Sequence, residues 1–119
     1  MNYIDRIEND KWIRKNERFP EKNIKLNRII IHFSNMSKSW FVEQVELKNE
    51  NGVQLYYNDG IDDNVKNFIG ATNINPLYLC FDNGNLNDNS TFKIVLKIDK
   101  NRFSYQYVKS NNIWKFEEV

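Results

Sequence analysis

At 119 residues the chain has room for one domain of common size and for no second one. Its composition, 40% hydrophobic and 14% aromatic with 4 Gly and 2 Pro, excludes a disordered tail and a coiled coil. The net charge of +1 excludes a bulk attraction to nucleic acid or to an anionic membrane. We therefore expect residues 1–119 to form a single folded domain.

The first twenty residues carry a helical pattern. Ile4, Ile7 and Trp12 recur at spacings that place them on one helical face. The residue before Pro20 is pushed away from helical dihedrals, so the predicted N-terminal helix ends near Phe19. Acidic residues interrupt this stretch, and we expect neither a signal peptide nor a membrane span in it.

The next segments alternate in the manner of strands. Ile24–Ser34 is apolar on both faces, which predicts an inner strand. Trp40–Lys48 and Val53–Tyr57 flank an Asn51-Gly52 turn, and this arrangement predicts a hairpin. A short second helix is expected from Ile61 to Gly70, because its apolar residues recur at helical offsets and glycine is placed for a C-terminal cap.

Strand patterns continue to the end of the chain. Leu77–Phe81 predicts a strand, and Leu86–Ser90 an exposed loop. Phe92–Ile98 and Phe103–Tyr107 predict a hairpin, and Ile113–Phe116 a last strand. The predicted fold class is α+β: a mainly antiparallel sheet of about seven strands, an N-terminal helix and one short inserted helix.

The chain has one cysteine, Cys80, and one histidine, His32. An internal disulfide and a Cys/His metal cage within one chain are therefore excluded, and a reducing, cytoplasmic location is expected. The two residues are also the sole candidates for a thiolate and base pair. Both lie in apolar strand patterns, and we favour a buried structural cysteine over a catalytic one.

Three carboxylates gather at Asp59, Asp62 and Asp63. Calcium binding is disfavoured, because an EF-hand loop centred on Gly60 would place Leu55 at its first ligand position. Capping of the predicted second helix explains the carboxylates better. The glycines form no phosphate loop and no serine elbow occurs, so we expect no cofactor, no metal and no enzymatic activity.

Aromatic residues with lysines nearby in the sequence suggest a platform for single-stranded nucleic acid. The aromatic residues are Tyr56, Tyr57, Phe103, Tyr105 and Tyr107. The last three alternate on the face that should cover the core, where aromatic residues are much more often packing groups. Nucleic-acid binding is therefore the weaker interpretation.

Charge is distributed unevenly. Residues 1–30 and 91–119 each carry +3, whereas residues 31–90 carry −5. Several of the acidic residues of this middle segment lie in predicted turns, where they would present a carboxylate surface to a basic partner. An ordinary solvated surface explains the same pattern.

In size, architecture and charge pattern the chain resembles the immunity proteins of bacterial toxin and immunity systems, including those of contact-dependent inhibition. The resemblance implies a non-enzymatic inhibitor that binds one toxin, such as a basic nuclease. The docking residues would then be acidic groups and two aromatic anchors: Asp59, Asp62, Asp63, Asp82, Asp88, Tyr57 and Trp40. The alternatives are a small regulatory or structural subunit, an enzyme, or a single-stranded nucleic-acid binder.

Overall fold

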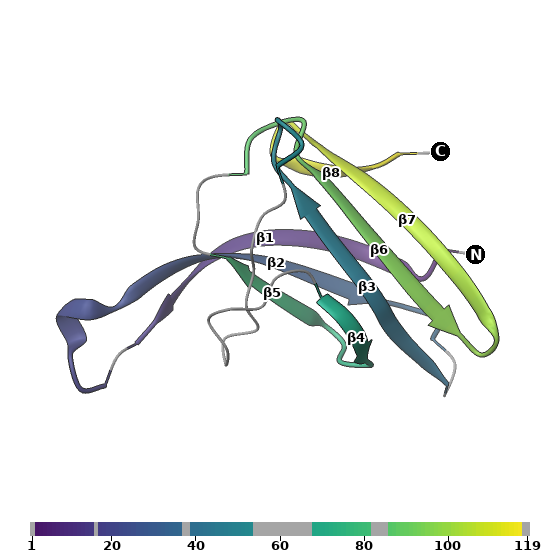
Figure 1. The fold of residues 1–119 in the computed structure, drawn as a ribbon, viewed down its shortest axis with the longest axis horizontal. Helices are drawn as coiled ribbons and strands as arrows, with labels where there is room; N and C mark the ends of the chain where they lie inside the picture. Colours follow the sequence, from purple (N-terminus) through teal and green to yellow (C-terminus); the bar gives the residue numbers. More distant parts are fainter. Residues whose placement is uncertain (1, 16, 37–38, 54–67, 82–85, 118–119) are drawn as a thin grey trace.

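The computed structural model describes residues 2–15, 17–36, 39–53, 68–81 and 86–117. Within these ranges the chain forms eight strands and one short 3-10 turn (Figure 1). The strands make two antiparallel sheets, so the predicted antiparallel pairing is confirmed, but the predicted α+β class is wrong. No helix among the described residues is long and apolar enough to cross a membrane.

The two sheets differ in size. The first has the order β1 (Ile4–Arg14), β2 (Ile24–Phe33) and β5 (Leu77–Phe81). The second has the order β4 (Phe68–Thr72), β3 (Trp40–Lys48), β6 (Thr91–Ile98), β7 (Asn101–Ser110) and β8 (Ile113–Glu117). The 3-10 turn, Pro20–Lys22, joins β1 to β2. The inner strand predicted at residues 24–34 is confirmed as β2, and five further predicted strands coincide with β3, β5, β6, β7 and β8.

The predicted N-terminal helix is the strand β1. Its register against β2 shifts between Ile4 and Arg6, which marks a bulge. The extra residue places Ile4 and Ile7 on the same side of the strand although they are three positions apart. The bulge therefore reproduces the three-residue spacing of Ile4 and Ile7, one of the two spacings from which the helix was predicted.

The end of the predicted second helix is also extended. Phe68, Ile69 and Gly70 belong to β4, which pairs with β3. Backbone hydrogen bonding to an open sheet edge thus overrides the local helical pattern. The rest of that helix lies outside the described residues, because residues 54–67 are not described. The same holds for nearly all of the second strand of the hairpin predicted after Asn51-Gly52. The turn itself is present: Gly52 has φ +76° and its N–H donates to the carbonyl of Asn49 at 3.0 Å.

The core lies between the two sheets, whose strands cross one another in Figure 1. Inward positions alternate along β6 and β7, as the sequence pattern of these strands predicts. The first sheet contributes Ile4, Ile29, Ile31, Phe33, Leu77 and Leu79, and the second Val42, Val45, Leu47, Phe92, Ile94, Leu96, Ile98, Tyr107 and Trp114. Phe103 and Tyr105 pack against this core, as expected for structural aromatic residues.

The loop predicted at residues 86–90 is only partly exposed. Ser90 is fully buried and Leu86 packs against the core, whereas Asn87, Asp88 and Asn89 are exposed. The loop is pinned because the N–H of Asn89 donates to the carbonyl of Lys109 at 2.8 Å. This contact holds the loop beside the end of β7.

Candidate functional site: a basic arm and a polar pocket at its base

The strands β1 and β2 continue beyond the body of the protein as a two-stranded arm, residues 12–26. The last position of β2 that pairs with β5 is Asn27, which lies opposite Lys11. Residues 12–14 and 24–26 pair only with each other. In Figure 1 the arm projects away from both sheets, with the 3-10 turn at its tip.

The arm is basic and exposes apolar side chains. Its sequence holds five basic and two acidic residues. Ile13 is 49% exposed and Phe19 is 40% exposed. Two cations lie near the Phe19 ring, with Arg18 Cζ 5.5 Å and Lys22 Nζ 4.9 Å from its centroid. An isolated two-stranded ribbon is marginally stable in water. Exposed apolar side chains on such a ribbon therefore suggest a surface that contacts a second molecule.

The base of the arm is the point where the core ends. Along β2 the inward side chains run from Phe33 through Ile31 and Ile29 to Asn27. The inward series of β7 ends in the same way, passing from Tyr107 to Lys109. The two sheets therefore face each other with polar side chains at this end, and a pocket opens there.

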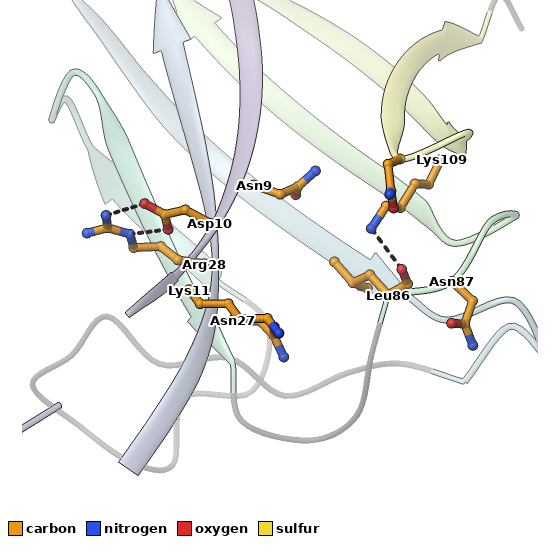
Figure 2. A pocket seen from close by; sticks show the side chains of 9 residues that line it. Asn9, Asp10, Lys11, Asn27, Arg28, Leu86, Asn87 and Lys109 are labelled. Carbon is orange, nitrogen blue, oxygen red and sulfur yellow. Dashed lines mark hydrogen bonds and ion pairs between the residues drawn. The ribbon is translucent and has the colours of Figure 1, made fainter. Parts of the chain in front are cut away.

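The polar pocket has a volume of about 500 Å³ and lies between the first sheet and the end of β7 (Figure 2). It is bordered by four asparagines, three basic residues, one carboxylate and one leucine: Asn9, Asn27, Asn87, Asn112, Lys11, Arg28, Lys109, Asp10 and Leu86. A neighbouring hollow shares Asn9, Lys109 and Asn112. The lining holds two more positive than negative groups.

Lys109 is the most buried charged residue of the pocket. It is 7% exposed, and its Nζ donates to the backbone carbonyl of Leu86 at 2.8 Å. Burial lowers the pKa of this ammonium, and the nearby carboxylate of Asp88 partly opposes the shift. Among the described residues no carboxylate pairs with it. The pocket thus contains a cation that is stabilised mainly by a neutral oxygen.

Asn9 connects the pocket to the second sheet. Its Oδ1 accepts a hydrogen bond from Trp114 Nε1 at 2.9 Å, a contact between residues 105 positions apart. The Trp114 ring in turn packs on Phe92, with 5.9 Å between centroids. The side of the pocket formed by β1 is therefore held in place by β8.

The carboxylate of the lining is already paired. Asp10 accepts two hydrogen bonds from the Arg28 guanidinium, including Nε to Oδ1 at 2.7 Å. This hydrogen bonding lowers the pKa of Asp10. Figure 2 shows the pair on the far side of β1 and β2 from Lys109. The Asp10 charge is consequently directed away from the buried ammonium.

The single histidine, His32, lies on the outer face of the first sheet. His32 Nε2 lies 2.8 Å from Glu8 Oε2, and this hydrogen bond lowers the pKa of Glu8. Cys80 of β5 is paired with Arg28 of β2 in the backbone ladder. Arg28 is four residues before His32 on the same strand. At about 3.3 Å per residue the two backbone positions are about 13 Å apart along the sheet. The structure does not bring them together as a nucleophile and base.

The predicted docking residues fall mostly outside the described residues: Asp59, Asp62, Asp63, Asp82 and Tyr57. Asp88 is described and exposed. Trp40 is half-buried and packs on Phe33, with ring centroids 5.2 Å apart. The structure therefore places Trp40 against the core.

Three further acidic residues of the middle segment make hydrogen bonds. Glu43 accepts from the guanidinium of Arg102 at 2.8 and 3.0 Å, which lowers the pKa of Glu43. Glu46 accepts from a glutamine, and Glu50 accepts from Asn87 at 3.0 Å. Part of the expected carboxylate surface is thus engaged within the molecule. No group of His, Cys, Asp and Glu suited to a metal ion occurs in the part of the chain that the structure describes.

Sequence reasoning missed both the arm and the pocket. The signal for the pocket is present in the alternation, because the inward apolar series end on Asn27 and Lys109. The pairing of these strand ends could not be read from one sequence. Comparison of the chain with protein-family models, with curated proteins and with solved structures finds no match.

Proposed function

We propose that this chain is a non-enzymatic, cytoplasmic protein that binds and inhibits another protein, as immunity proteins inhibit their toxins. The observation that carries the proposal is the projecting arm. It exposes Ile13 and Phe19 among basic side chains, away from the core that stabilises the fold. Burying such a surface requires a second molecule, and aromatic and arginine side chains are frequent anchors in protein interfaces.

Two surfaces of opposite charge would contribute to the partner interface. The arm is basic, whereas the segments around residues 59–63 and 82–88 are acidic in sequence. A partner that matches both would carry an acidic site for the arm and a basic site for the carboxylates. Charge complementarity of this kind accelerates association and excludes other partners.

Growth rescue is the test of this function. The chain is produced in a bacterial host together with the toxin-like product of the gene beside its own. We expect restored growth and co-purification of a stable complex. Absence of both would show that the proposal is wrong. A stable complex that leaves the activity of the partner unchanged would instead indicate a regulatory or structural subunit.

Charge reversals then locate the interface. We expect the triple change Lys15→Glu, Arg18→Glu and Lys22→Glu to weaken the complex at least about tenfold, the effect of losing 1.4 kcal/mol. The double change Asp62→Lys and Asp63→Lys should slow association and alter its salt dependence. Lys93→Glu, on the outer face of the second sheet, is the matched control and should have no effect. Equal affinities for all variants would exclude both surfaces.

A further inference from the structure

We propose that the polar pocket at the base of the arm binds a small ligand that carries an oxyanion, a phosphate or a carboxylate, on the Lys109 ammonium. The inference is independent of the proposed function, because it concerns a cavity and not the exposed arm. It begins from the position of a buried cation at the end of an otherwise apolar series of side chains.

The first step concerns the hydrogen-bonding capacity of Lys109. An ammonium group has three N–H donors, and the described residues supply one acceptor, the carbonyl of Leu86 at 2.8 Å. The Asp88 carboxylate is near Lys109 but forms no ion pair with it among the described residues, and burial of a cation without a paired counter-charge is unfavourable. A ligand oxyanion in the pocket would supply both the missing acceptors and the missing charge.

The second step concerns the other donors around the pocket. Lys11 adds a positive charge from β1, and side-chain amides border the pocket at Asn27 of β2 and at Asn112 of the turn between β7 and β8. Figure 2 shows Asn9 on the side of β1 that faces Lys109, with Leu86 beside the lysine. Amide and ammonium donors that converge from several strands are typical of sites that hold a charged oxygen.

A third observation lies directly behind Lys109. Ser90 continues the ladder opposite Lys109, whose N–H donates to the Ser90 carbonyl at 2.9 Å. Ser90 is fully buried, and its Oγ lacks a hydrogen-bond partner among the described residues. Alternation places both side chains on the inner face, so a polar group without a partner adjoins the proposed site.

Size limits the class of ligand. A volume of about 500 Å³ suits a small molecule of the size of a mononucleotide or a tricarboxylate. The single carboxylate of the lining is bound to Arg28 and directed away from Lys109 in Figure 2, so it does not repel an anion there.

The test is a titration of the whole chain with inorganic phosphate, adenosine monophosphate and citrate, observed by ¹H–¹⁵N NMR. The Trp114 indole resonance is a reporter within the site, because this group donates to Asn9. We expect saturable shifts of that resonance and of the amides near Asn112, at concentrations up to about 10 mM, which covers Kd values near 1 mM. The phosphate and citrate titrations distinguish the two kinds of oxyanion. Absence of saturable shifts at the pocket with all three probes would overturn the proposal.

Variants assign the binding to the pocket. Lys109→Met removes the ammonium and keeps the aliphatic stem, and we expect about tenfold weaker binding or more, the effect of losing one charged hydrogen bond. Lys11→Gln should also weaken binding. Because Lys11 is exposed, this variant keeps the experiment decisive if Lys109→Met fails to fold. Lys93→Gln, on the opposite face of the second sheet, is the matched control. Equal affinity in the wild type, Lys11→Gln and Lys93→Gln would contradict the assignment.

Discussion

Tyr107 illustrates how a single side chain in this core combines apolar packing with a titratable group. It is 6% exposed, and its ring lies 6.4 Å from Phe92 and 5.7 Å from Phe116, measured between centroids. Burial raises the pKa of its hydroxyl to about 12, with a smaller contribution from Tyr105. The folded state therefore binds the Tyr107 proton more tightly than the unfolded chain does.

This difference predicts a loss of stability in alkali. An unfolded tyrosine ionises near pH 10, whereas the folded Tyr107 ionises near pH 12. Its contribution is fully present below pH 10 and is lost as the pH rises towards 12, a change of about 2–3 kcal/mol in the free energy of unfolding. We expect Tyr107→Phe to show a correspondingly smaller loss over this interval in urea unfolding. Parallel pH profiles of the two proteins would contradict this account.

Ion pairs on the surface contribute less to the free energy of unfolding than the buried core does. The ion pair of Glu43 with Arg102 lies on an exposed face, where solvent screens the attraction. The Asp10 and Arg28 pair also has two hydrogen bonds, and its arginine is more shielded, 24% exposed against 62% for Arg102. Such pairs fix the register of the strands more than they stabilise the fold.

At the scale of elements, strand β1 has two roles. Its first half contributes Ile4 to the core, and its second half forms one side of the arm. Its outer edge carries a bulge and charged side chains such as Arg6 and Glu8, features that discourage pairing with the edge of another sheet. The exposed edge is thus compatible with a protein that binds a partner through the arm and not through strand addition.

We expect that shortening the arm abolishes partner binding without changing the stability of the fold. Replacing residues 15–23 by Asn-Gly joins Arg14 to Ile24, which are already paired, through a tight turn. Because none of the described residues in this range belongs to the core, we expect the midpoint of thermal unfolding to stay within a few degrees, equivalent to about 0.5 kcal/mol or less. Partner binding should be lost. A large fall in the midpoint would show that the arm supports the fold.

The sequence predicted strands where alternation was regular, as in β6 and β7, and where an unbroken apolar run marked the inner strand β2. It failed where one residue displaced the alternation: the bulge after Ile4 produced a helical spacing in β1. It also failed at Phe68–Thr72, where an open sheet edge decided the conformation. Local pattern carries no information about bulges or about which edge is free to pair.

At the scale of the whole molecule, two sheets of unequal size share one core, and two of the three tryptophans connect the sheets. Trp40 of β3 packs on Phe33 of β2, and Trp114 of β8 donates to Asn9 of β1. Each contact joins one sheet to the other. The candidate site could not be predicted at this scale, since the pocket depends on how β7 crosses the first sheet.

A shared core predicts cooperative unfolding. We expect the Trp40 and Trp114 indole resonances to disappear at the same urea concentration, because neither sheet can bury its apolar face alone. Residues of the arm, which lie outside the core, should lose amide protection earlier. Two separate transitions for the tryptophans would show that the sheets unfold independently.

The direction of the arm has a practical consequence. In Figure 1, β1 begins and β8 ends on the side of the molecule opposite to the arm. A tether attached near Asn2 or Glu117 would therefore hold the protein on a sensor chip with residues 17–23 facing the solution. Immobilisation in this orientation leaves the tip free to meet an analyte.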